Sequence, residues 1–148
     1  MAITTLMDRG SIRVVDYRCQ VGPAEEPFVE RHRSFSVAYV RRGSFGYRVR
    51  GESYELVTGS VLVGHPGDEY VCTHDHFQGD ECLNFYLDPA LIEALGARPE
   101  AWRTGGVPPL PELMVLGELA QSVAEGRSDV GLDEAGLWFR GTGDRTPG

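Results

Sequence analysis

The sequence of 148 residues contains no long hydrophobic run: a membrane-spanning helix would need about 18 consecutive apolar residues. The first eight residues also lack the basic start and apolar stretch of a secretory signal, so a cytoplasmic location is expected. Cysteine is scarce, and the three cysteines, Cys19, Cys72 and Cys82, cannot all be paired with one another. Structural disulfides are uncommon in reducing compartments, so these residues are expected to be buried thiols or metal ligands.

Basic charge is scarce as well, since 14 lysine and arginine residues stand against 22 acidic ones and the net charge is -8. A protein that neutralises nucleic-acid phosphates needs clustered lysine and arginine. A short basic stretch, Arg41, Arg42, Arg48 and Arg50, lies in a strand-like region and is typical of solvated strand edges. These 148 residues alone are therefore expected not to bind DNA specifically.

Common catalytic templates are also missing from the chain. There is no Gly-x-Ser-x-Gly nucleophile elbow and no glycine-rich phosphate loop ending in Lys-Ser or Lys-Thr. The adjacent acidic residues Asp80 and Glu81 would point to opposite faces of a strand. They are therefore more typical of a turn than of an acid–base pair.

The chain does contain a series of short segments rich in β-branched and aromatic residues, separated by turns. Turn signals include Gly43-Ser44, Gly51-Glu52 and Pro66-Gly67-Asp68. The number and spacing of the segments favour a mainly β fold, a sandwich or barrel, over residues 10–88. Strands are predicted at 11–18, 35–42, 45–50, 53–57, 60–64, 69–76 and 81–87.

The pattern changes from strands to helices after Leu87. Asp88 and Pro89 are typical of a helix N-cap and a first helical residue, which predicts a helix over 89–96. A glycine- and proline-rich stretch follows, and apolar residues at helical spacing predict a second helix over 111–125.

The second helix either covers the sheets or joins two subunits, and we expect a homodimer in which residues 113–124 take part. Residues 89–140 would form a helical linker belonging to the same domain as the strands. The polar, turn-forming tail 141–148 is expected to be disordered.

Residues 39–87 read YVRRGSFGYRVRGESYELVTGSVLVGHPGDEYVCTHDHFQGDECLNFYL, with a Cys-x-His-Asp-His stretch followed by Gly-Asp-Glu-Cys-Leu. This sequence resembles the N-terminal domain of AraC/XylS-type transcriptional regulators, and the resemblance extends over roughly residues 10–130. It implies a cupin (jelly-roll) sensor domain, a helical linker and a C-terminal pair of helix-turn-helix units. No helix-turn-helix pattern follows residue 130. The resemblance therefore implies an effector- or metal-sensing domain without its own DNA-binding part, either as a fragment of a regulator or as a truncated, standalone relative.

The same resemblance bears on the cupin metal site. Metal-binding cupins take ligands from a His-x-His pair with a following Glu, and from a later His after a Pro-x-Gly turn. Here residues 30–34 contain a single histidine, His32, and Tyr70 occupies the position expected for the later histidine. The usual three-histidine iron site is not assembled, which disfavours an enzyme. We instead expect His32, Tyr47 and Tyr70 to contact a small-molecule effector.

Cysteine and histidine alternate along the predicted strand 69–76. Cys72, His74 and His76 are two residues apart, which places their side chains on one face of a strand. If 81–87 returns as a hairpin partner, His76 lies opposite Cys82 at a Cβ distance of about 4.5–5.5 Å. Such a pair is close enough to share one ion.

Thiolates and imidazoles favour zinc, and copper is conceivable at a sulfur-rich site. The expected zinc ligands are Cys72, His74, His76, Cys82 and, from the end of the first strand, Cys19. Two alternatives stay open. In the first, the cysteines are small buried hydrophobic residues and the histidines are surface residues of a strand. In the second, the cluster is the metal site of a small cupin enzyme.

Overall fold

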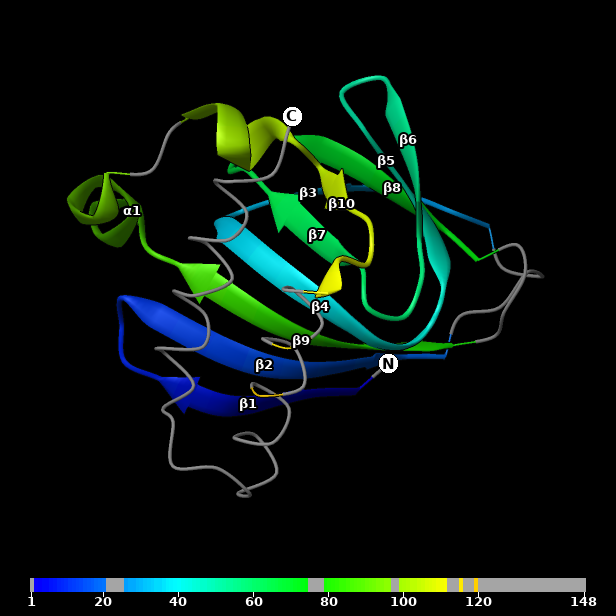
Figure 1. Cartoon of the computed structure of the whole chain (residues 1–148), viewed down its shortest axis with the longest axis horizontal. Coiled ribbons are helices and arrows are strands. Elements are labelled where there is room, and N and C mark those ends of the chain that lie inside the picture. Colours follow the sequence, from blue (N-terminus) through cyan, green and yellow to red (C-terminus); the bar gives the residue numbers. More distant parts are fainter. Residues whose placement is uncertain are drawn as a thin grey trace.

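The computed structural model describes residues 2–20, 26–74, 79–96 and 99–111, together with Val115 and Leu119. Two antiparallel sheets face one another in a sandwich (Figure 1). The larger sheet contains, in spatial order, β1 (Ala2–Asp8), β2 (Ile12–Cys19), β9 (Asp80–Leu87), β4 (Phe35–Gly43), β7 (Val61–Gly64) and β10 (Gly106–Val107). The smaller sheet contains β3 (Val29–Arg31), β8 (Glu69–Thr73), β5 (Phe45–Val49) and β6 (Glu52–Leu56). The predicted mainly β architecture is confirmed.

Alternation of side chains places β5 as the sequence predicts. Phe45, Tyr47 and Val49 are buried, and Arg48 between the last two is exposed. All residues of β7 are buried, as expected for a strand covered on both faces. The strands β1, β3 and β10 were not predicted, because each is short or lies in a segment without clear alternation.

The turn at Gly43 is one that only glycine allows. Its φ is +79°, a left-handed conformation that side chains with a Cβ rarely adopt. A Cβ added there would lie 2.5 Å from the carbonyl oxygen of Gly79. The close approach holds the end of β4 against the beginning of β9, where Asp80 lies.

The central strands of the larger sheet carry buried residues on both faces. Its outer face carries a hydrophobic cluster that includes Leu83 and Phe85 from β9 and is covered by Ile92 and Trp102. Its inner face packs on the smaller sheet through Ala38, Val40, Phe45, Tyr47, Val49, Leu56, Leu62 and Cys82. β9 contributes to both clusters, so its position is fixed from two sides.

The helix predicted after Leu87 is confirmed as α1 (Pro89–Leu95). The Asp88 side chain accepts a hydrogen bond from the Ala90 amide at 3.2 Å, and Gly96 ends the helix in the left-handed conformation. A short 3-10 helix, η1 (Pro99–Arg103), leads to β10. Within the described ranges, no helix combines the length and hydropathy needed to span a bilayer.

Three predictions fall on parts of the chain outside the described residues. They are the second helix over 111–125 with its dimer contact, apart from Pro111, Val115 and Leu119, the remainder of the linker to residue 140, and the tail 141–148. His76 also lies outside the described residues.

The predicted hairpin between the strands 69–76 and 81–87 is wrong. β8 pairs with β3 and β5 in the smaller sheet, and β9 pairs with β2 and β4 in the larger one. Cys72 is therefore opposite Tyr47, and Cys82 is opposite Tyr17 and Val40. Both edges of β9 are occupied, so β8 has no place beside it, and the chain crosses from one sheet to the other between Thr73 and Asp80.

Substituting the core residue Leu83 tests this arrangement. Its side chain is fully buried in the outer cluster, so Leu83→Ala should lower the free energy of unfolding by about 2–5 kcal/mol. Val57, at 39% exposure, is the control, and Val57→Ala should change it by no more than about 0.5 kcal/mol. Urea unfolding followed by circular dichroism measures both. Equal, small effects would contradict the central position of β9.

Candidate ligand-binding cavity

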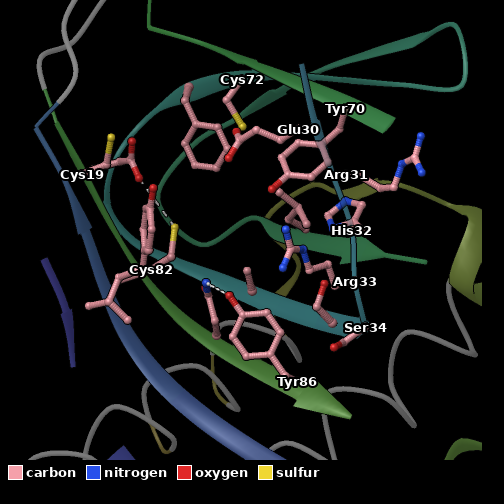
Figure 2. Close-up of a pocket in the computed structure, with 18 of the residues that line it drawn as sticks. Cys19, Glu30, Arg31, His32, Arg33, Ser34, Tyr70, Cys72, Cys82 and Tyr86 are labelled. Atoms are coloured by element: carbon pink, nitrogen blue, oxygen red, sulfur yellow. Dashed lines mark hydrogen bonds between the residues drawn. The ribbon is translucent and has the colours of Figure 1, made fainter. Parts of the chain in front are cut away.

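A cavity of about 430 Å³ lies between the two sheets. Leu62 and Ala38 from the larger sheet and Phe45 from the smaller one form part of its apolar wall. Its volume lies in the range of small-molecule sites in proteins. Figure 2 shows that the polar lining is divided, with the three cysteines at one end and His32, Tyr70, Arg33, Ser34 and Tyr86 toward the other.

The cysteine end of the cavity is built from three different strands. Cys19 ends β2 and is directly opposite Asp80, the first residue of β9. Cys82 follows on β9, and Cys72 comes from β8 in the other sheet. His74 lies immediately after β8. None of the cysteines, all of which the structure describes, is in a disulfide.

Asp80 is the most constrained residue at this end. Its side chain is 4% exposed, and its Oδ2 lies 3.5 Å from Nδ1 of His74, whose side chain is 11% exposed. Neither of these atoms has a hydrogen-bond partner. The Cys82 thiol donates to the other oxygen, Oδ1, at 3.8 Å. Burial raises the pKa of the Asp80 carboxyl to about 6, while the nearby His74 and the Cys82 hydrogen bond act in the opposite direction.

Two of the cavity thiols, Cys72 and Cys82, are not activated nucleophiles in the absence of a bound cation. Burial raises the pKa of Cys72, and the nearby carboxylates of Glu30 and Asp80 raise it further. Burial also raises the pKa of Cys82, with Asp80 again adding to the effect. Both groups are therefore protonated thiols at neutral pH.

The opposite end brings together the three residues expected to contact an effector. His32 Nε2 is 2.7 Å from the Tyr47 hydroxyl, and the His32 ring stacks on Tyr70 with centroids 4.0 Å apart. His32 and Tyr70 line the cavity, whereas Tyr47 is fully buried behind them. Tyr47 therefore orients His32 and does not itself face the space. Burial lowers the pKa of His32 to about 4, so its ring is neutral at physiological pH.

Two cavity residues that sequence reasoning missed carry polar groups into this space. Glu30, on β3, accepts a hydrogen bond from the Tyr70 hydroxyl, and burial raises the pKa of its carboxyl. Asn84, on β9, donates from Nδ2 to the Tyr86 hydroxyl at 3.1 Å, while its buried Oδ1 has no partner. Asn84 Oδ1 is an acceptor left for a ligand that carries a donor.

Asp80 is a further missed residue, and the interpretation of Asp80 and Glu81 as a turn is wrong. Both residues lie in β9 and point to opposite faces, as their alternation requires. Glu81 is within 3.7 Å of Arg18 and 3.9 Å of Arg42, whereas Asp80 is buried at the cavity. The signal was present in the sequence, because a strand beginning at 80 puts Asp80 on the same face as Cys82.

The structure brings only part of the expected zinc set together. Among the described residues, the ligand atoms of Cys19, His74 and Asp80 all lie within 4.8 Å of one another. Cys72 and Cys82 line the same cavity but do not belong to this group. Thiol, imidazole and carboxylate are all ordinary zinc ligands, so these residues fit a divalent cation.

No family model matches the chain, and no curated protein matches it. Solved structures do match. The cupin domain of Schizosaccharomyces pombe Cnp3 gives a TM-score of 0.51 at 11% identity, over 64% of this chain and 69% of that one. The chain has a cupin fold. FeII HppE in complex with its substrate gives a TM-score of 0.51 at 10% identity, over 57% of this chain and 52% of that one. A Rhizobium leguminosarum protein of unknown function gives a TM-score of 0.51 at 17% identity, over 58% of this chain and 79% of that one.

At these identities the likeness establishes the fold alone. Its neighbours include an enzyme and a protein of unknown function, and one cupin fold carries many activities. The function of this chain has to be argued from the residues of its cavity.

The low pKa of His32 gives a test of the stacked end. An NMR titration of the His32 ring should show a midpoint near the pKa of about 4, below the usual 6.5. The unfolded chain takes up this proton at higher pH than the folded one, so stability should fall as the pH drops from about 6.5 toward 4. His32→Gln, which does not titrate, should show a smaller fall over the same range. A midpoint near 6.5 would mean that the ring is not buried between Tyr47 and Tyr70.

Proposed function

We propose that this cupin is the sensor domain of a cytoplasmic AraC-type transcriptional regulator, and that a small-molecule effector binds in the cavity between its sheets. The cavity of about 430 Å³ between the sheets is the observation that carries the proposal. The resemblance of residues 39–87 to AraC/XylS-type regulators supplies the regulatory context.

The stacked end supports binding over cupin iron chemistry. His32 stands between two tyrosines, its Nε2 is engaged by the Tyr47 hydroxyl, and the Tyr70 hydroxyl is engaged by Glu30. These groups form a hydrogen-bonded aromatic wall in place of a three-histidine ligand set. Such a wall suits the flat face of an organic ligand, and the unpartnered Asn84 Oδ1 suits a hydroxyl or amine donor on it.

A route from the cavity to the rest of the regulator runs along β9. Asp80, Cys82, Asn84 and Tyr86 all line the cavity from this strand. The strand ends at Leu87, and Asp88 caps α1 directly afterwards. A ligand that shifts β9 would therefore move α1 and the segment that follows it.

A small metal-dependent cupin enzyme is the second candidate. The grouping of Cys19, His74 and Asp80 favours it, because zinc with three protein ligands and an open position is a common catalytic arrangement. Zinc is the ion expected from this donor set in either case.

The proposed regulatory role predicts what the reading frame encodes beyond residue 148 and which form of the protein binds DNA. Beyond residue 148 the frame should encode two helix-turn-helix units, and the product extended through them should bind its own promoter in a mobility-shift assay. The purified 148-residue chain, with its net charge of -8, should not. A stop codon directly after residue 148, or a downstream domain of another kind, would contradict the proposal.

A cavity-filling variant of the extended protein supplies the control for effector sensing. Ala38 lines the cavity and is 7% exposed, so Ala38→Phe should fill the space. Promoter affinity should be retained, while the response of a promoter reporter to growth conditions should be lost. Val57→Phe, at an exposed position, should leave both unchanged. A normal response in Ala38→Phe would remove the cavity from the sensing mechanism.

A further inference from the structure

We propose that Cys19, His74 and Asp80 form a divalent cation site, here called the Cys–His–Asp site, which holds zinc and leaves one coordination position open to the cavity. Cation binding at this site does not depend on the regulatory role, and it is measured on the isolated chain. The residues differ from the histidine positions of the usual cupin iron site and from the hairpin set expected from the sequence.

Two sheets have to come together to form the Cys–His–Asp site. Cys19 and Asp80 are directly opposed across the β2–β9 ladder, which brings their Cβ atoms to about 4.5–5.5 Å. His74 approaches from the other sheet, after β8. An ion held by all three would therefore link the two halves of the sandwich.

The spacing suits a shared ion better than a hydrogen bond. The 3.5 Å between His74 Nδ1 and Asp80 Oδ2 exceeds the usual hydrogen-bond length of about 2.7–3.2 Å. Two ligands bound tetrahedrally at about 2.0–2.2 Å are roughly 3.4 Å apart. The three ligand atoms already lie within 4.8 Å of one another, so a contraction of about 1 Å would bring the cysteine into the same shell.

A second observation is that two polar atoms at this site, one from Asp80 and one from His74, are buried without a hydrogen bond. The Asp80 side chain is 4% exposed, and neither its Oδ2 nor His74 Nδ1 makes a hydrogen bond. Burying such atoms without hydrogen bonds is unfavourable, and coordination of an ion would satisfy both.

The surroundings complete a metal site. The Cys82 thiol donates to Asp80 Oδ1, which fixes the orientation of the carboxylate and leaves Oδ2 for the ion. Glu30 adds a carboxylate beside the same space, near enough to His74 to interact with it electrostatically. All three ligand residues line the cavity, so a fourth ligand would come from water or from a molecule bound there.

The donor set selects the class of ion. One thiol favours a borderline metal such as zinc over magnesium or calcium, which prefer oxygen ligands. Three protein ligands with an open position are typical of zinc sites that bind an exchangeable ligand. The molecule that completes the site is expected to offer a coordinating group such as a carboxylate or thiolate.

Zinc content and affinity of the purified chain test the Cys–His–Asp site. After chelator treatment and zinc loading, the wild type should retain about one zinc per chain by elemental analysis. Competition with a chromophoric chelator should show that Cys19→Ser, His74→Gln and Asp80→Asn each weaken zinc binding by about 100-fold or more. The matched controls Cys72→Ser and His65→Gln, outside the site, should retain wild-type affinity.

Thermal unfolding with and without zinc separates loss of the site from loss of the fold. Zinc should raise the Tm of the wild type and of both controls, and should leave the Tm of the three site variants unchanged. Circular dichroism of the metal-free variants checks that each is folded. Absence of zinc from the loaded wild type would overturn the proposal. So would a loss in Cys72→Ser equal to that in Cys19→Ser.

Discussion

β9 lies between β2 and β4 in the larger sheet, and the registers of its two ladders decide which side chains reach the cavity. Pairing of Cys19 with Asp80 puts a thiol and a carboxylate side by side at one end. Alternation then brings Cys82, Asn84 and Tyr86 toward the space. A slip of one residue would turn this whole set toward the outer cluster, where Leu83 and Phe85 now pack.

Holding these groups inside the sandwich is costly in the absence of a ligand. Burial raises the pKa of both the Asp80 and the Glu30 carboxyl, which means that their charged forms are disfavoured there. Asn84 Oδ1 adds an acceptor without a partner. A cation at one end and a donor-bearing molecule at the other would offset these costs. Occupancy would thus be coupled to the stability of the sandwich, which is a property a sensor domain needs.

Local features of the fold could be predicted from the sequence because they depend on neighbours along the chain. Side-chain alternation located β5, and the Asp88-Pro89 pair located the start of α1. Which strands pair is decided by tertiary contacts, and an alternating pattern gives the face of a strand without naming its partner. The hairpin of β8 with β9 was wrong for this reason, although Cys72, His74, Cys82 and Cys19 do line one cavity.

In the candidate site, too, local features could be predicted from the sequence and contacts between the sheets could not. His32, Tyr47 and Tyr70 were expected to contact an effector, and the structure places His32 against both tyrosines. Their contact with an effector stays a prediction. Asp80 and Glu30 were missed because their role depends on the facing sheet. Asp80 was assigned to a turn on its local sequence, and Glu30 lies on β3, a strand too short to show alternation.

X-ray absorption at the zinc edge of the loaded chain shows whether Cys19 and Asp80 share one ion. We expect a shell with one sulfur at about 2.3 Å and two or three nitrogen or oxygen ligands at about 2.0–2.2 Å. Two or more sulfurs would place the ion beside Cys72 and Cys82, as expected from the predicted hairpin of residues 69–76 with 81–87. A shell without sulfur would remove Cys19 from the site, and either result would contradict the Cys–His–Asp site.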